Sequence, residues 1–507
     1  MTTIHPPLRR KDIYEQRHQL VHICNLIMES TKNNLFRGTL NDPQFVEFHF
    51  KKYLPDTARF GRSDADIYEA TNAWCDSDKV NHEEREHKYG HISDWDTSEV
   101  TTMYMLFSDK LSFNCDIGSW DVSKVIDMSM MFVMANAFNQ DIGAWDVSQV
   151  TDMSQMFEQA NTFNQDIGKW NVSQVIDMSE MFCSAMTFNQ DIGRWDVSRV
   201  TDMSHMFYNT NAFNQDIGRW IVSQVTDMSW MFAHTNAFNQ DIGAWDVSQV
   251  TDMSWMFSDV WAFNQDIGQW SVSQVTDMSW MFSGTCTFNQ DIGQWDVSQV
   301  INMSKMFHDT KAFNQDIGKW DVSQVIHLSW MFHDAKTFNQ DIGKWDVYTA
   351  TCMSGMFSNT MAFNQDIGKW DVSQVTDMSW MFRNTEVFNQ DIGKWDVSQV
   401  TNMLGMFNSA RTFNQDIGTW NMSHVTNISY MFCSTYTFNQ DIGSWDTSQV
   451  TDMTCMLRDA RAFNHNIDRW KVYSVSIMSD KSRHQVNVVG GGIIWWDVID
   501  TSQSIIK

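Results

Sequence analysis

The sequence predicts a repeat solenoid, built as a stack of α/β coils with one parallel sheet of short strands and short helices on the opposite side. Three observations predict it. Tryptophan recurs every 25 residues from Trp95 to Trp470, which places sixteen tryptophans on a strict period, and a period of this length is typical of stacked repeats. Inside each unit the apolar residues follow first a helical and then a strand spacing. One unit alone buries too little apolar surface to offset the ordering of its chain, so neighbouring units must stack.

Four segments follow from where this register begins and ends. Residues 1–63 show helical periodicity and are predicted to form an N-terminal helical segment. Residues 64–91 are predicted to cap the array, because the first coil would otherwise expose an apolar end and an open strand edge. The solenoid itself is expected over 92–478 as about fifteen to sixteen repeats. Residues 479–507 lose the register and are expected to form a C-terminal cap or tail with one or two strands.

The first half of the unit has the spacing of a short helix. Met153, Met156, Phe157 and Ala160 lie at i, i+3, i+4 and i+7, which places all four on one helical face. Asp152, or Thr151 before it, is a suitable N-cap, since a side-chain oxygen there can accept a hydrogen bond from the first turn. We therefore expect about two helical turns in each unit.

The second half of the unit has the spacing of a strand. Over 167–172, Trp170 and Val172 lie two residues apart and are expected to face inward, while their neighbours face outward. Hydrogen bonds between such strands would join neighbouring coils. The periodic tryptophans, among them Trp120, Trp145 and Trp170, are then expected to stack as a ladder inside the solenoid.

Two polar residues recur as regularly as the tryptophan. An asparagine follows each loop phenylalanine, as at Asn139, Asn164 and Asn189, and is expected to form a stacked amide ladder that satisfies backbone groups of the turns. An aspartate recurs two residues later, as at Asp141 and Asp166. Turn capping is the simpler interpretation, and calcium is the alternative. Calcium needs six to eight oxygen ligands, and the glycine-aspartate nonapeptide repeat typical of stacked calcium sites is missing.

Composition excludes several kinds of partner and site. The chain has 62 acidic and 35 basic residues, a formal net charge of −27, which argues against a surface that neutralises nucleic-acid phosphates. No stretch is long and apolar enough to span a bilayer. The N-terminal residues lack the apolar run of a classical signal peptide, and localisation is left open. The eight cysteines form no CxxC site and are expected to be reduced thiols.

Metal and cofactor sites are not expected. His308 and His333 share one position on adjacent units, but two further ligands for zinc are not evident. The sequence contains no nucleophile elbow, phosphate loop or zinc-hydrolase motif, so we predict that the protein is not an enzyme and needs no cofactor.

The repeated unit, exemplified by residues 150–173, closely resembles the BspA-type leucine-rich repeat family, and in particular its branch of 25/26-residue repeats known from mycoplasma and listerial lipoproteins as DUF285. The resemblance covers roughly residues 64–478 and includes the predicted cap. It implies a right-handed, leucine-rich-repeat-like solenoid that serves adhesion or protein binding, usually at a cell surface, without catalytic activity. The secretion or lipoprotein signal of such proteins is missing from this sequence, so the resemblance does not fix a location.

Specificity must come from positions that vary between units. The most distinctive is ten residues after the periodic tryptophan, where the predicted helix would face solvent. Large exposed aromatic patches tend to mark interaction sites. The alternatives are that these side chains only pack on one another between coils, or that they reflect recent duplication of one unit. The candidate binding residues are Trp230, Trp255, Trp280, Trp330 and Trp380 at this position, with Trp261 and Tyr208 nearby.

A second variable surface flanks the periodic tryptophan, where charged residues such as Lys169 and Asp196 alternate; exposed pairs of this kind are expected to contribute little. The predicted function is therefore a non-enzymatic scaffold that binds an unidentified protein or glycan through variable positions on an invariant core. The alternative is a purely structural spacer or assembly component without a specific binding site.

Overall fold

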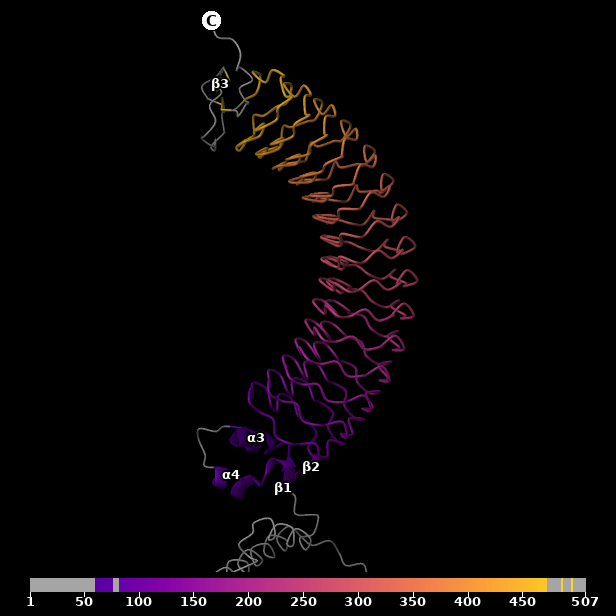
Figure 1. Cartoon of the computed structure of the whole chain (residues 1–507), viewed down its shortest axis with the longest axis vertical. Coiled ribbons are helices and arrows are strands. Elements are labelled where there is room, and N and C mark those ends of the chain that lie inside the picture. The colour runs from indigo at the N-terminus through magenta and orange to yellow at the C-terminus, as the bar shows by residue number, and fades with distance from the viewer. Residues whose placement is uncertain (1–59, 76–81, 472–484, 487–493, 496–507) are drawn as a thin grey trace, which may run out of the picture.

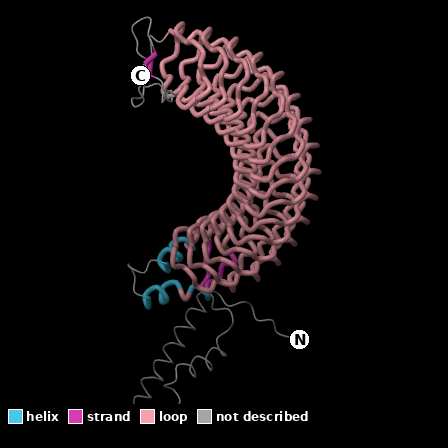
Figure 2. Tube along the Cα trace, turned by 45° about the horizontal axis from the view of Figure 1, so that its top comes forward, coloured by secondary structure: helices cyan, strands magenta, loops and turns pink. Residues whose placement is uncertain are grey.

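The repeats stack into one curved solenoid. The computed structural model describes residues 60–75, 82–471, 485–486 and 494–495, and the coils between Trp95 and Trp470 follow one another along an arc (Figures 1 and 2). A single apolar core runs through the whole array and includes every periodic tryptophan. None of the helices in the described residues is both long enough and apolar enough to cross a membrane.

A small α/β cap precedes the first coil. Strand β1 (Phe60–Ser63) pairs in parallel with β2 (Trp95–Glu99), which begins the first coil. Between them lie α3 (Ile67–Cys75), α4 (His82–Tyr89) and the 3-10 helix η2 (Ile92–Asp94). Ile67 and Ala70 of α3 are fully buried against the core. The boundary predicted at residue 63 is therefore wrong by a few residues, because 60–63 form a strand of the cap instead of the end of a helical segment.

The remaining terminal predictions lie mostly outside the described residues. These comprise the helical segment over 1–59 and nearly all of the tail. In the tail, β3 (Gln485–Val486) and β4 (Ile494–Trp495) form a short antiparallel pair.

The short helix predicted in each unit is wrong: consecutive turns take its place. The four apolar residues of its predicted face, such as Met153 and Phe157, are fully buried. However, Met156 N–H donates to Met153 O at 3.2 Å, and Ala160 N–H donates to Phe157 O at 3.0 Å. The third residue of each turn, Gln155 or Gln159, has a φ of 56° or 55°. This is the positive φ that a type II turn requires at its third residue.

The turns leave every second N–H free to bond to the next coil. Met153 N–H donates to Asp177 O at 3.0 Å, Gln155 N–H to Ser179 O at 2.8 Å, and Phe157 N–H to Met181 O at 2.9 Å. An α-helix would direct these groups to its own carbonyls and leave this side of adjacent coils without backbone hydrogen bonds between them. Parallel β-bridges repeat along the same side, from Thr102↔Asp127 to Asn427↔Asp452. We call the segments equivalent to 151–160 the inner wall.

The hydrogen-bonded side is therefore opposite to the one predicted. The expected strand over 167–172 contains a turn, in which Trp170 N–H donates to Ile167 O at 3.1 Å. The coils are joined here through a side chain, because the indole N–H of Trp170 donates to Ile142 O of the preceding coil at 3.1 Å. We call the segments equivalent to 167–173 the outer wall.

The direction of bending follows from the spacing between equivalent rings of adjacent coils. On the outer wall Trp170 and Trp195 have centroids 6.5 Å apart, whereas on the inner wall Trp230 and Trp255 are 4.1 Å apart. Intermediate positions give intermediate spacings of 6.1 Å for Phe163–Phe188 and 5.7 Å for Phe157–Phe182. The stack must bend toward the side with the closer spacing, so the inner wall forms the concave face.

The cap supports this assignment. The hydroxyl of Tyr68 on α3 donates to the backbone carbonyl of Tyr104 at 2.9 Å, and Tyr104 belongs to the inner wall of the first coil. Figure 1 shows α3 on the side toward which the arc opens.

Polar side chains join the coils between the two walls. Asn139 Oδ1 accepts hydrogen bonds from Asn164 N–H and from the Gln165 amide, both at 3.0 Å; Asn164 in turn accepts from Asn189 N–H at 2.9 Å. The asparagine column is thus a continuous hydrogen-bonded ladder. The aspartate column caps turns: Asp141 Oδ1 accepts from Gly143 N–H at 2.9 Å.

Candidate aromatic interaction site on the inner wall

Three consecutive coils place an indole at the same point of the inner wall. Trp230, Trp255 and Trp280 each occupy the third position of a turn, and their rings stack with centroids 4.1 Å apart at both steps and interplanar angles of 9° and 13°. All three are half-buried. Their ring faces cover one another, so the outward-facing part of the stack consists of ring edges.

Charged or polar side chains close both ends of the stack. The imidazole of His205 stacks on Trp230 with a centroid distance of 5.4 Å, and Lys305 places Nζ 3.8 Å from the ring centroid of Trp280. Burial lowers the pKa of Lys305, and burial also lowers the pKa of His205 against the opposing effect of Glu180. The column thus holds a cation on an indole face at one end, a favourable arrangement.

The backbone under these indoles is unusual. The φ angles of Trp230, Trp255 and Trp280 are 59°, 60° and 59°. A positive φ is uncommon for any residue other than glycine, and for a bulky one it costs about 1–3 kcal/mol. The hydrogen-bonded ladder imposes this geometry on every coil, and the sequence places its largest side chain there.

Trp330 and Trp380 do not extend this stack. Lys305 separates Trp330 from Trp280, and the next coil offers Gly355, where an added Cβ would lie 2.4 Å from the Trp330 indole. Trp380 lies in the same way against Gly405.

The two remaining candidates, Tyr208 and Trp261, differ in their contacts. Tyr208 contacts Trp230 edge-on, with centroids 5.7 Å apart. Trp261 is 60% exposed, and among the described residues its ring contacts no other aromatic ring. The structure therefore brings together Trp230, Trp255, Trp280 and Tyr208, and leaves Trp261, Trp330 and Trp380 outside the group.

The aspartate column predicted from Asp152 to cap a helix runs beside the indoles and caps turns instead. Asp227, Asp252 and Asp277 each precede a stacked tryptophan by three residues. Each caps a turn: Asp252 Oδ1 accepts from Ser254 N–H at 2.8 Å. Burial raises the pKa of Asp252, and the neighbouring carboxylates of Asp227 and Asp277 raise it further. The prediction did not place this column beside the candidate tryptophans, and the recurrence of Asp at a fixed distance before Trp was the available signal.

Comparison with known proteins agrees with this repeat architecture. The family described as "Mycoplasma protein of unknown function, DUF285" matches seven overlapping stretches, which together cover residues 77–488: 77–193, 136–242, 177–294, 251–359, 276–392, 328–432 and 376–488. The chain belongs to the DUF285 family. No curated protein matches this DUF285 sequence.

One solved structure that the comparison found similar to this DUF285 protein is "Functional domain of InlJ from Listeria monocytogenes includes a cysteine ladder". It is 10% identical, and the match covers 69% of this chain with a TM-score of 0.18. The chain spans 63% of the length of that structure.

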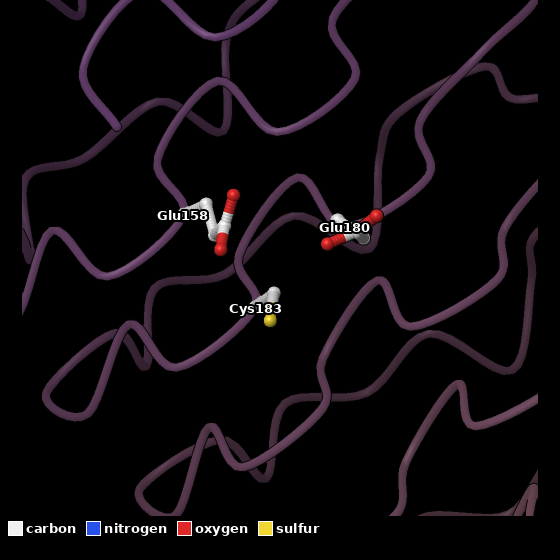
Figure 3. A group of neighbouring side chains, drawn as sticks. All are labelled: Glu158, Glu180 and Cys183. Carbon is white, nitrogen blue, oxygen red and sulfur yellow. The ribbon is translucent and has the colours of Figure 1, made fainter. Parts of the chain in front are cut away.

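One cluster in the DUF285 array has metal-ligand residue types. Glu158, Glu180 and Cys183 come from two adjacent coils of the inner wall, and their ligand atoms all lie within 4.8 Å of one another (Figure 3). The sequence prediction named no metal ligand. Burial, followed by the charges of Glu158 and Glu180, raises the pKa of the Cys183 thiol to about 12, and both carboxylates already accept hydrogen bonds from Gln159 and Gln155. With this raised pKa, the Cys183 thiol stays protonated at neutral pH.

The histidine pair lies farther along the same wall. His308 and His333 have ring centroids 4.8 Å apart. Burial, with help from the positive charges of His333 and Lys305, lowers the pKa of His308 to about 4. His333 Nε2 lies 3.0 Å from Asp334 Oδ2. Within the described residues, neither histidine belongs to a cluster of three or more ligand side chains.

Proposed function

We propose that this protein is a non-enzymatic scaffold that binds a protein partner on the concave face, and that Trp230, Trp255 and Trp280 with Tyr208 form the contact site. The supporting observation is a three-indole stack that is half-exposed on this wall. The residue before each indole and the residue three positions after it are small and buried or half-buried: Ser229, Ser254 and Ser279 before, and Ala233, Ser258 and Ser283 after. Clustered, partly exposed aromatic residues are typical of interaction hot spots.

The stacking favours a protein partner over a glycan. Sugar rings pack against aromatic faces, and here the faces are covered by neighbouring rings 4.1 Å away. The exposed edges carry indole N–H groups, and no described residue accepts a hydrogen bond from those of Trp230, Trp255 or Trp280. None of these groups is buried without a partner, so they are accessible to acceptors on a ligand such as peptide carbonyls.

Two broader expectations belong to the same proposal. The family resemblance supports an adhesion role at a cell surface and a right-handed, leucine-rich-repeat-like winding of the coils. The absence of catalytic motifs in the sequence supports a protein that binds and does not catalyse. The remaining alternative is a spacer without a specific site, in which the indoles stack only to join coils.

Selection of ligands on the purified full chain tests the proposal. A displayed library of random short peptides and a glycan array are screened against the wild type, against a triple variant with Trp230, Trp255 and Trp280 replaced by Ser, and against Trp261→Ser as a matched exposed-tryptophan control. We expect peptides that bind the wild type and the control and are lost with the triple variant, with circular dichroism unchanged.

Three results would contradict the proposal. Retention of the selected peptides by the triple variant would show that the indole stack is not the site. Enrichment of glycans alone would identify the ligand class as carbohydrate. Absence of any ligand, together with full function after deletion of two whole coils in register, would favour the spacer.

A further inference from the structure

We propose that the segment of the partner that occupies the indole stack is an extended, basic polypeptide, with arginine as the preferred side chain. This inference rests on the function proposed above and specifies the chemistry of the ligand. It combines the charge distribution along the inner wall, the position of the carboxylates and the behaviour of the chain's own cations.

The indole stack lies in a stretch without lysine or arginine. Between Arg219 and Lys305 the sequence contains nine aspartates and no lysine, arginine or glutamate, and His234, which lies there, has Nδ1 3.6 Å from Asp259 Oδ2. Four of the nine aspartates lie on the inner wall, namely Asp227, Asp252, Asp259 and Asp277. A surface of one sign attracts ligands of the opposite sign and accelerates their association.

The aspartates beside the indoles lack cationic partners. Asp227 and Asp252 use Oδ1 to accept from Ser229 N–H and Ser254 N–H, both at 2.8 Å. Neither forms an ion pair with another residue in the part of the chain that the structure describes. The raised pKa of Asp252 reflects burial and the like charges above and below it, and a cation placed beside this column would relieve that repulsion.

These carboxylates are close enough to act on a ligand of the indole column. His205 occupies the same turn position as the stacked tryptophans, and both Asp227 and Asp202 act electrostatically on its imidazole. A cationic group of a ligand lying along the indole column would be attracted by the same carboxylates.

The chain's own cations already use aromatic rings as binding surfaces. Lys305 Nζ lies 3.8 Å from the ring centroid of Trp280, and Arg383 Cζ lies 5.2 Å from that of Trp380. Lys305, His205 and the stacked rings cover the faces of the three indoles, so a partner meets only the ring edges. Arginine fits the carboxylates beside those edges best, because its planar guanidinium pairs with a carboxylate through two hydrogen bonds, while the peptide carbonyls of the partner can accept from the indole N–H groups.

A charge-matched pair of variants separates this site from the general acidity of the protein. The inner-wall variant replaces Asp227 and Asp252 with Asn, and the outer-wall control replaces Asp196 and Asp246 with Asn. Asparagine occurs naturally at both positions and keeps the turn cap, since Asn302 Oδ1 accepts from Ser304 N–H at 3.0 Å and Asn171 Oδ1 accepts from Ser173 N–H at 3.2 Å. Both variants change the net charge equally.

Titration calorimetry of the full chain then uses four probes: a peptide of alternating Arg and Ser, matched Lys–Ser and Glu–Ser peptides, and spermine. We expect the Arg–Ser peptide to bind most tightly and the Glu–Ser peptide not to bind. The inner-wall variant should weaken Arg–Ser binding about fivefold, or about 1 kcal/mol, and the outer-wall control should leave it unchanged. Replacing the three stacked tryptophans with Ser should weaken it as well.

Each opposing outcome has a distinct meaning. Equal weakening by both Asn variants would show that the overall charge of the protein explains the binding, and this would overturn the proposed site. Spermine binding with the same dependence on Asp227 and Asp252 would overturn the polypeptide assignment. If the Arg–Ser peptide fails to bind while the random library still selects peptides on the indoles, the basic-ligand inference is wrong and the proposed function stands. Failure of both screens would overturn both.

Discussion

The guanidinium carbon of Arg62 lies 4.5 Å from the ring centroid of Trp95. Within the array, many periodic tryptophan rings stack on the ring of the next coil, as Trp145 does on Trp170 and Trp170 on Trp195, but Trp95 begins the ladder and, among the described residues, stacks only on Trp120. Arg62 takes the place of the missing ring. It is 7% exposed and donates hydrogen bonds to the carbonyls of Tyr89 and Gly61, so the charged group is held by backbone acceptors while its plane caps the apolar ladder.

Replacing Arg62 with Ala should therefore destabilise the start of the array. Loss of a buried group with hydrogen bonds from a charged donor costs about 2 kcal/mol. Hydrogen exchange of amides in the coil that begins at Trp95 measures the effect locally. Lys88→Ala is the control, because Lys88 pairs with Glu69 on the surface, where such pairs contribute little. Equal protection in both variants would rule out the capping role.

The glycine two residues before each periodic tryptophan from Trp120 to Trp445 is required by close approach between coils. A Cβ added at Gly143 would lie 2.4 Å from Asp166 O of the next coil. We expect Gly143→Ala to lower the free energy of unfolding by about 1–3 kcal/mol, measured by urea denaturation. Gln149→Ala, at an exposed position of the following turn, should change it little. A neutral effect at Gly143 would mean that the coils separate easily at this point.

Replacement by glycine should stabilise the fold where the turn requires a positive φ, and should not do so elsewhere. Ser434 has a φ of 59°, whereas Ser448 is not among the residues with positive φ. Ser434→Gly should raise stability by about 1 kcal/mol, because glycine adopts this conformation without steric cost. Ser448→Gly should lower stability slightly, since it only adds freedom to the unfolded chain. Thermal unfolding of the two variants gives the comparison, and destabilisation of equal size in both would contradict the turn geometry.

The histidine pair should make the array less stable in mild acid. Burial is the main cause of the lowered pKa of His308, about 4, and of His333. Between about pH 6.5 and pH 4 the unfolded chain binds protons that the folded chain does not, so the free energy of unfolding falls as pH falls through this range. Ser occupies the same position at Ser283 and Ser358, which makes the double replacement of His308 and His333 by Ser a natural comparison.

Denaturation at several pH values gives the test of this histidine effect. The double variant should lose less stability than the wild type between neutral pH and pH 4. An identical decline in both proteins would assign the acid sensitivity to other groups.

The sequence was sufficient to predict the repeat and the residues that face the core. It could not distinguish the predicted helix from consecutive turns, because Met153, Met156, Phe157 and Ala160 point inward in both. The turns depend on positive φ at positions that side chains such as Gln155 and Trp230 normally avoid. A signal was present in part: the second of these positions in each unit, equivalent to Gln159, carries asparagine, aspartate or glycine in many coils, as at Asn209, Asp259 and Gly284, and these residues tolerate a positive φ.

The backbone hydrogen bonds between coils were predicted on the wrong wall because of the predicted helix. Once 153–160 was assigned to a helix, Trp170 and Val172 remained as the only strand-like pair, and the backbone ladder was placed with them. The candidate site was affected less. The register alone predicted that Trp230, Trp255 and Trp280 share one position on adjacent coils, whereas their orientation on a concave face depends on the ladder and could not be deduced from spacing.

The difference in spacing between the two walls makes the shape of the protein depend on a single residue type. Outer-wall tryptophans hold adjacent coils 6.5 Å apart, while backbone hydrogen bonds fix the inner wall. A chain of the same units with a smaller ring in place of each tryptophan would form a straighter rod, and one with more coils would continue toward a closed ring. The number of units and the size of the side chain at the tryptophan position would then determine how large a partner fits inside the arc.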